Sequence, residues 1–161
     1  MTSVLIEVGM SRFPVFGFTD RPEKLPVIHN PDQLEIPVDS STFQQILANV
    51  ETGEEIHFAF LELIFVGEEA IVELNREHLN KEYVTDILTF RYDDRTDRKE
   101  MEASIYCCVP RIYEQAGELG TEIDSEFYRV FIHGLLHLAG YEDADETQKK
   151  EMRLIEEDYM P

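Results

Sequence analysis

The sequence predicts an α+β domain in which a small mixed sheet packs against clustered helices. Three observations lead to this prediction. Strand-like segments are spread over the first two thirds of the chain, helix-like segments follow one another in the last third, and one of those helices is almost entirely apolar. Strands followed by a group of helices are typical of the α+β class. A chain of 161 residues is long enough to bury the core of one domain.

Four segments have the aliphatic and aromatic composition of strands. The run EIHFAFLELIFVG at 55–67 is the most apolar and predicts a buried strand. The segments SVLIEV at 3–8, DILTFRY at 86–92 and ASIYCCV at 103–109 predict three more, the last two joined by a charged loop. The adjacent cysteines of the last strand would form a strained disulfide, so they are expected on alternate faces of that strand.

Cap residues set the ends of the predicted helices. These helices cover 41–50 after Asp39 or Ser40, 68–79 with Glu68 and Glu69 in its first turn, Pro110 to Gly117–Gly120, Asp124 or Ser125 to Gly140, and the segment after Asp145. Five of the seven prolines fall in 14–37, which predicts an irregular arm with little helix. We therefore expect a single domain over 1–161, with a Pro-rich arm at 1–38 and a core at 56–160.

The composition limits the possible partners. The net charge is −20, from 34 acidic and 14 basic residues, which opposes general nucleic-acid binding and suits a basic partner or a high-salt interior. The segment 76–99 differs, because its six basic and six acidic residues balance. No apolar run approaches the roughly 18 residues of a membrane span, and no signal-peptide pattern is present. The sequence therefore predicts a cytoplasmic protein without a membrane partner.

The stretch HGLLHLAGYED at 133–143 predicts a metal site. His133 and His137 lie one helical turn apart on one face, a common arrangement for two ligands of one ion. Gly140 can end the helix and return the chain, so that Asp143 reaches the imidazoles. This spacing is that of a zincin-like metal helix with a carboxylate as third ligand. Glu142 and Asp145 are competitors for the third position, and a hydrogen-bonded histidine pair without metal is the alternative.

The residue types around this motif restrict the chemistry. A carboxylate ligand is compatible with Zn²⁺ and makes the site more suitable for harder ions such as Mn²⁺. Gly134 stands where a metalloprotease carries its catalytic Glu, so peptide hydrolysis by that route is disfavoured. Glu126 lies on the histidine face about 10 Å before His133. It is too distant to be a ligand, and it either orients a water or pairs with Arg129.

The segment TDILTF at 85–90, followed by a strand and then by HGLLHLAGYED, resembles the bacterial YbeY family of endoribonucleases and rRNA maturation factors. That family carries HGxLHLxGYDH and a Thr-Asp/Asn-aliphatic-Leu-Ser-Phe strand. The resemblance covers about 56–160. It includes LNREHLNKEYVTDILTF, PRIYEQAGELG, SEFYRVFIHGLLHLAGYED and the trailing MRLIEED.

The resemblance implies a compact α+β fold with one zinc ion held against a small sheet. His133 and His137 match the first two family ligands, and Asp143 falls on the third, a histidine in most members. The implied activity is cleavage of single-stranded RNA, in 16S rRNA maturation and ribosome quality control. The implied partner is the small ribosomal subunit, which a basic ribosomal protein would connect to this acidic chain.

Two departures from the family pattern concern activity. The family usually has Arg in a Tyr-Arg-Gly-Lys segment where this chain has Leu79, while Lys81 matches the family Lys. Arg76 and Arg91 are possible substitutes for that Arg. The family's Gly-Asp-Ile is replaced by the tripeptide at 103–105, Ala-Ser-Ile.

A catalytic hypothesis follows from these residues. Lys81 or Arg76 would offset charge on the transition state. Asp86 or Thr85 would orient the scissile group, with Glu126 as a further candidate beside the metal ligands. Two other functions remain open: a metallohydrolase of another substrate class, and a non-catalytic ribosome assembly factor with a structural metal.

Overall fold

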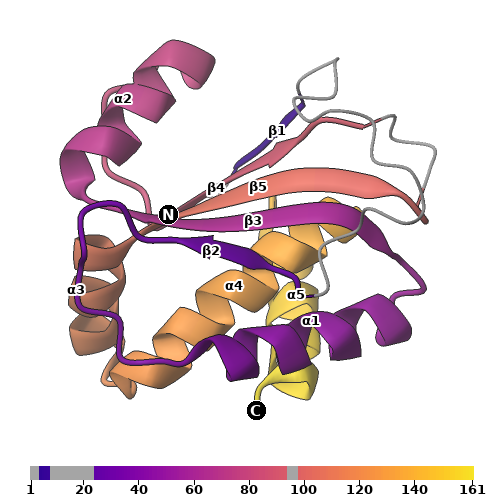
Figure 1. Ribbon diagram of the computed structural model, residues 1–161. Helices are drawn as coiled ribbons and strands as arrows, with labels where there is room; N and C mark the ends of the chain where they lie inside the picture. Colours follow the sequence, from indigo (N-terminus) through magenta and orange to yellow (C-terminus); the bar gives the residue numbers. More distant parts are fainter. Residues whose placement is uncertain (1–3, 8–23, 94–97) are drawn as a thin grey trace.

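Strand pairing confirms the predicted mixed sheet. The structure is a computed structural model that describes residues 4–7, 24–93 and 98–161. Within these ranges one sheet has the strand order β1-β4-β5-β3-β2 (Figure 1). Its strands are β1 (Val4–Glu7), β2 (Val27–His29), β3 (Phe58–Val66), β4 (Ile87–Arg91) and β5 (Met101–Cys108). Strand β4 runs antiparallel to β5, and the other neighbouring pairs are parallel.

The helices lie on both sides of this sheet, but unequally (Figure 1). They are α1 (Ser40–Gly53), α2 (Glu68–Leu79), α3 (Val109–Leu119), α4 (Ile123–Ala139) and α5 (Glu146–Tyr159). Helices α1, α3, α4 and α5 lie below the sheet in this view, and α2 lies above it. The predicted α+β class with clustered C-terminal helices is therefore confirmed. None of the described helices is long and apolar enough to cross a membrane.

Each face of the sheet has its own apolar core. The larger core contains Phe65 and Ile105 from the strands and Phe43 and Phe131 from α1 and α4. The smaller core includes Ile71 from α2. A fully buried side chain of this size contributes about 1.5–3 kcal/mol relative to an exposed one, so the larger core dominates the stability of the fold. It is this core that fixes the position of α4.

The two cysteines separate these cores. Cys107 belongs to the larger core and Cys108 to the smaller one, and both are buried free thiols. The expectation that they lie on alternate faces of one strand is thus confirmed, because successive side chains of a strand point in opposite directions.

Most predicted helix ends are confirmed by cap geometry. Asp39 accepts a hydrogen bond from the Thr42 N–H at 3.1 Å, and Asp145 forms a capping box with Gln148. The predicted cap of α4 is wrong. The helix begins at Ile123 after Glu122, and the predicted cap Asp124 lies in its first turn. An acidic side chain is favourable there through the helix dipole without capping the end.

The Pro-rich arm contains one element that its composition did not predict. Strand β2 (Val27–His29) lies within 14–37 and pairs in parallel with β3 at the edge of the sheet. An edge strand tolerates nearby proline because one side of its backbone needs no partner. The described part of the arm, 24–37, contains no helix, as expected. Residues 3 and 8 of the first predicted strand, and the centre of the charged loop at 94–97, lie outside the described residues.

Candidate metal centre

Helix α4 is held against the sheet by close packing at one glycine. A Cβ atom on Gly134 would lie 2.7 Å from Ile87 Cδ1 and 3.2 Å from Thr89 Cγ2, both on β4. The glycine therefore lets the helix backbone approach the strand more closely than any other residue would allow. Phe131 and Leu135 bury the same helix in the larger core. As a result, the axis and rotation of α4 are fixed before any ligand binds.

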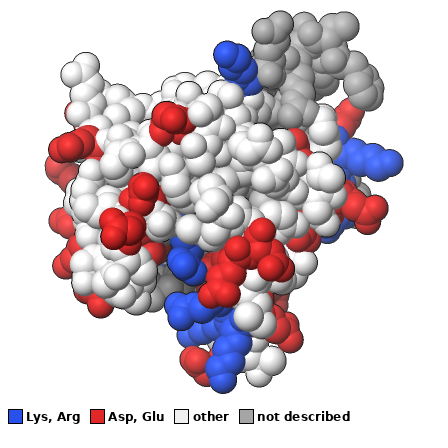
Figure 2. Space-filling view, turned by 90° about the horizontal axis from the view of Figure 1, so that it is seen from below, with Lys and Arg blue, Asp and Glu red and all other residues white. Residues whose placement is uncertain are grey.

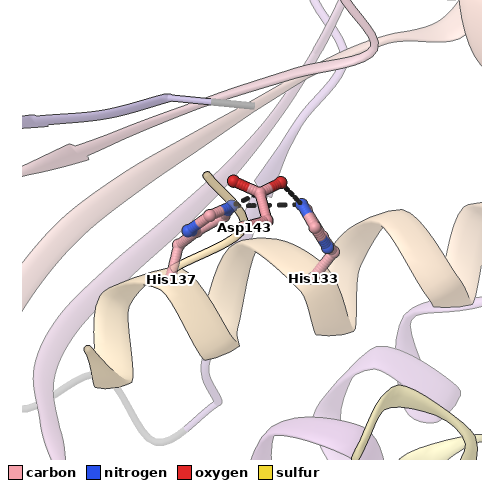
Figure 3. A group of neighbouring side chains, drawn as sticks. All are labelled: His133, His137 and Asp143. Carbon is pink, nitrogen blue, oxygen red and sulfur yellow. Dashed lines mark hydrogen bonds and ion pairs between the residues drawn. The ribbon is translucent and has the colours of Figure 1, made fainter. Parts of the chain in front are cut away.

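The two histidines of α4 and one carboxylate meet at a single point (Figure 3). His133 Nε2 lies 3.1 Å from His137 Nε2. Asp143 Oδ2 lies 3.3 Å from His133 Nε2 and 3.6 Å from His137 Nε2. Within the described residues, these three side chains form the group whose ligand atoms are close enough together to hold a metal ion. The two competitors for the third position lie elsewhere: Glu142 is exposed, and Asp145 caps α5.

Each imidazole is also held through its other ring nitrogen. His133 Nδ1 lies 2.5 Å from Glu156 Oε1 of α5, and His137 Nδ1 lies 3.0 Å from the Tyr141 carbonyl oxygen. When Nδ1 donates its proton to such an acceptor, the lone pair of Nε2 points away from it. Here both Nε2 atoms point toward the Asp143 carboxylate. Partners of this kind orient histidine ligands in metal sites.

The pKa shifts indicate that a cation is favoured between these side chains. Burial lowers the pKa of His133, but its hydrogen bonds to Asp143 and Glu156 outweigh burial and raise the pKa to about 9. Burial and the neighbouring His133 lower the pKa of His137. Burial opposes ionisation of Asp143, but the hydrogen bond with His133 and the charges of the histidines give a lowered pKa. The centre therefore favours either a proton on His133 or a metal ion.

The loop that carries Asp143 is held by contacts with α1 and with His137. Gly140 ends α4 with a left-handed φ of 111°, as its position predicted. Tyr141 follows and donates a hydrogen bond from its hydroxyl to Glu54 Oε2 of α1 at 2.9 Å. Its carbonyl accepts the bond from His137. Because the same residue contacts α1 and a candidate ligand, the return of the chain toward the histidines is fixed.

A second group of polar side chains continues from the centre along α4. Gln115 Nε2 of α3 donates to Asp86 Oδ2 at 3.1 Å and to Glu126 Oε1 at 2.8 Å. Arg129 lies 3.9 Å from Glu126 and 3.8 Å from Glu156. Two of the predicted site residues, Asp86 and Glu126, are thus tied together by one amide, and Arg129 connects them to the residue that holds His133.

These residues line one groove of about 540 Å³, between α3, α4 and α5. Its lining includes Asp86, Glu126, His133 and Asp143, but neither Arg76 nor Lys81. The latter two belong to α2 and the segment after it, on the other side of the sheet (Figure 1).

Both of these cations interact locally instead. Arg76 pairs with Glu82 at 3.0 Å, and the Lys81 ammonium lies 5.8 Å from the centre of the Tyr83 ring. The other candidate for orienting the scissile group, Thr85, is fully buried beside Asp86 and is not among the residues that line the groove. The structure therefore places Asp86 and Glu126 in the same groove as His133 and Asp143, and leaves the other three candidates outside it.

One residue of the centre was not predicted at all. Glu156 is buried and contacts His133 from a helix 23 positions further along the chain. Its sequence signal is weak, because α5 is rich in exposed acids. The only available sign was its place four residues after Met152, the buried apolar residue that marks the inner face of α5.

Fold and centre together define a class of protein: an α+β protein in which a helix packed on the sheet and the loop after it bring together two imidazoles and a carboxylate that could hold one metal ion. Comparison with known proteins gives the family. The family model described as endoribonuclease YbeY matches residues 28–161. The chain therefore belongs to the YbeY family.

Individual relatives agree with this assignment. A protein named endoribonuclease YbeY from Chlorobium phaeobacteroides is 30% identical over 133 residues, which cover 83% of this chain and 93% of that protein. One of the same name from Ureaplasma urealyticum is 38% identical over 93 residues, which cover 58% of this chain and 60% of that protein. The solution structure of the TM1509 protein from Thermotoga maritima matches with a TM-score of 0.53 at 27% identity, covering 83% of this chain and 85% of that one.

Proposed function

We propose that this protein is a metal-dependent, single-strand-specific endoribonuclease that acts in 16S rRNA maturation and ribosome quality control. The observation that carries the proposal is the convergence of His133, His137 and Asp143 in a chain of the YbeY family. The groove beside this point gives a substrate access to it. We assign the role of metal ligands to these three residues.

The spacing of the ligand atoms is compatible with one small divalent ion, and the types of ligand favour zinc. Two atoms bound to one tetrahedral ion at about 2.0–2.1 Å lie about 3.3 Å apart, whereas neighbours around an octahedral ion at about 2.1 Å lie about 3.0 Å apart. The three separations between the ligand atoms are 3.1, 3.3 and 3.6 Å. Two imidazoles and one carboxylate are also a common ligand set of catalytic zinc. Mn²⁺ is the alternative that the carboxylate admits.

The number of ligands supports catalysis over a structural role for the metal. Structural zinc sites are closed by four protein ligands, and catalytic sites keep one position for water or substrate. In the described part of the chain, three side chains offer ligands to this point. Glu156 contacts the far nitrogen of His133, so it does not supply a fourth. An ion held by these three residues would keep a position for water or substrate, which suits a hydrolase better than a non-catalytic assembly factor.

The residues of the groove have separate roles in this proposal. A bound ion would supply a Lewis acid for a phosphate oxygen and lower the pKa of water. Asp86 is buried at the groove, and we assign it the role of orienting the scissile phosphate group or the attacking water. Glu126 holds Asp86 through Gln115, so it acts as a positioning residue. Glu156 keeps the His133 ring in its ligand orientation.

Packing at Gly134 makes peptide hydrolysis the weaker alternative. A metalloprotease needs a carboxylate at this position to act as general base. Here a Cβ atom would already lie 2.7 Å from Ile87 Cδ1 and 3.2 Å from Thr89 Cγ2, so a longer side chain would displace both. A glutamate would have to enter an apolar core without a partner, which costs several kcal/mol. The fold therefore excludes that base from the site.

The partner is proposed from charge. Phosphate neutralisation drives RNA binding, and a net charge of −20 opposes it. A basic protein of the small ribosomal subunit would dock on the acidic surface and bring the RNA to the groove. Such a partner implies that the protein works in the cytoplasm, where ribosomes assemble.

The test is cleavage of RNA by protein of defined metal content. Chelator-treated protein, and the same protein reloaded with Zn²⁺ or Mn²⁺, is given matched single-stranded and duplex RNA, and a protein substrate such as casein. We expect cleavage of the single strand by the loaded protein, faster in the presence of small ribosomal subunits, and none without metal. Equal cleavage by metal-free protein would overturn the mechanism, and cleavage of casein alone would overturn the substrate class.

A further inference from the structure

The groove beside the metal centre gathers basic side chains from three helices. They are Arg111 of α3, Arg129 of α4, and Lys149, Lys150 and Arg153 of α5. These five are more than a third of the chain's 14 Lys and Arg residues. Seen from below, the molecule shows one cluster of Lys and Arg side chains with acidic side chains directly beside it, and further acidic side chains are spread over that face (Figure 2). Six acids line the same groove, so the question is which of the five cations these acids already hold.

Acidic residues of the same groove already hold two of these five cations, Arg111 and Arg129. Asp143 and Glu156 contact the two nitrogens of His133. Glu118 is bound by the Arg111 guanidinium at 3.0 Å. The cations of α3 and α4 are therefore paired within the groove, and the three cations of α5 remain to be explained.

The α5 stripe, which we define as Lys149, Lys150 and Arg153, is in the opposite situation. All three side chains are exposed. Lys150 and Arg153 form no ion pair with any residue that the structure describes. Lys149 lies 3.5 Å from Glu146, but this pair is exposed on both sides. Exposed pairs of this kind contribute about 0–1 kcal/mol, so they are easily exchanged for another anion.

The stripe leads directly to the metal centre. Lys149, Arg153 and Glu156 are spaced i, i+4 and i+7, so they follow one side of α5. The distance from the first to the last is about 10 Å at 1.5 Å per residue. At its end, Glu156 holds His133. A chain of negative charges lying along the stripe would therefore arrive at the point where the three ligands meet.

The lining of the groove indicates which part of a nucleic acid it would contact. The lining contains no Phe, Tyr or Trp side chain, and its one imidazole, His133, is held between Asp143 and Glu156, so the groove offers little surface on which bases can stack. Its volume of about 540 Å³ is that of a small-ligand site, which suits one strand better than a duplex. We propose that the α5 stripe binds the phosphate backbone of the strand being cleaved, independently of its base sequence. This inference rests on the proposed function.

The experiment compares two double variants that remove the same charge. Lys150→Gln/Arg153→Gln removes the unpaired cations of the stripe, and Lys24→Gln/Lys99→Gln removes two exposed cations outside the groove. KM and kcat for cleavage of oligo(U) and oligo(A) are measured with metal-loaded full-length protein at several salt concentrations. The stripe variant should raise KM about tenfold on both oligonucleotides, the factor expected from losing one or two charge-assisted contacts. Its kcat should stay within about twofold of the parent, because the stripe does not touch the reacting atoms.

Salt dependence and rescue distinguish binding from indirect damage. Two lost phosphate contacts should lower the slope of log KM against log salt by about 1.4. The charge-conserving variant Lys150→Arg/Arg153→Lys should restore KM, and the control variant should change it less than twofold. The proposal for the α5 stripe is overturned if the parent cleaves RNA but both double variants behave alike, or if KM rises for one oligonucleotide only. The proposed function stands in either case. If the loaded parent cleaves neither RNA, both fall together.

Discussion

Two regions of this molecule carry basic side chains, and they differ in what those side chains face. The segment 76–99 has as many basic as acidic residues, whereas α5 has three basic and five acidic ones over 146–158. Composition therefore favours the first region as a nucleic-acid contact. In the structure, Arg76 of the first region pairs with Glu82 on the side of the sheet away from α4, and Arg91 and Arg98 donate to the carbonyl groups of Leu138 and Ala139 at the end of α4. None of the three lines the groove. The basic residues of α5 line the groove beside the metal centre.

This difference shows that the helix face on which a basic residue lies determines whether it reaches the groove, and that the net charge of a sequence window does not. Around α5, the helical period separates Lys149 and Arg153 from acids such as Glu151 and Glu157, which do not line the groove. Exposed charges are largely screened beyond about 8–10 Å at physiological ionic strength. A phosphate beside the α5 stripe would therefore respond mainly to the charges within that distance, and only weakly to the net charge of the whole protein.

The largest expected effect is the loss of metal and activity when a histidine beside the groove is replaced, compared with a histidine of the segment 76–99. His137→Ala removes a proposed ligand, so the bound metal should fall from one ion per chain to nearly none, and RNA cleavage should fall to background. His78→Ala is the matched control on α2, where the ring packs on Phe90 at 4.9 Å between centroids. It should keep both metal and activity. Metal analysis and cleavage assays measure the two outcomes, and a His137→Ala protein that keeps one firmly bound ion would contradict the ligand assignment.

The same contrast shows which parts of the centre could be predicted from sequence. The two histidines and Asp143 are fixed by a local pattern, because helix period and the Gly140 turn determine where they point. Glu156 contacts His133 only through the packing of α5 on α4, and strand β2 forms only by pairing with β3. Contacts of this kind depend on three-dimensional packing that no sequence window contains.

The next effect tests that unpredicted contact. Glu156→Gln keeps the shape of the side chain but removes the charge that orients the His133 ring, so metal affinity should fall about 10–100-fold, as for other supporting partners of histidine ligands. The control is Glu157→Gln, the exposed neighbour, which should leave affinity unchanged. Competition with a metal indicator measures both proteins. Equal affinities would show that the ring is held by the packing of α4 alone.

A smaller effect is expected for the basic residues on the other side of the sheet. Arg76→Gln/Lys81→Gln breaks an exposed ion pair with Glu82, which costs about 0–1 kcal/mol of stability. Because neither side chain lines the groove, KM for single-stranded RNA should change less than twofold, well below the change expected for the stripe variant. A tenfold rise in KM, measured in the same assay, would show that the substrate extends past the sheet edge to α2.

The smallest effect concerns the anchor of the loop that carries Asp143. Tyr141→Phe removes the hydroxyl that donates to Glu54 at 2.9 Å, but Tyr159 still donates to the same carboxylate at 2.8 Å. One lost hydrogen bond of this kind should lower the free energy of unfolding by about 1 kcal/mol and Tm by about 2–4 °C. The backbone carbonyl that holds His137 is unchanged, so metal affinity should stay within about twofold. Tyr83→Phe, an exposed hydroxyl, is the control in thermal unfolding of the metal-loaded proteins. A tenfold loss of metal affinity with unchanged Tm would mean that the tyrosine hydroxyl positions the ligand loop instead of stabilising the fold.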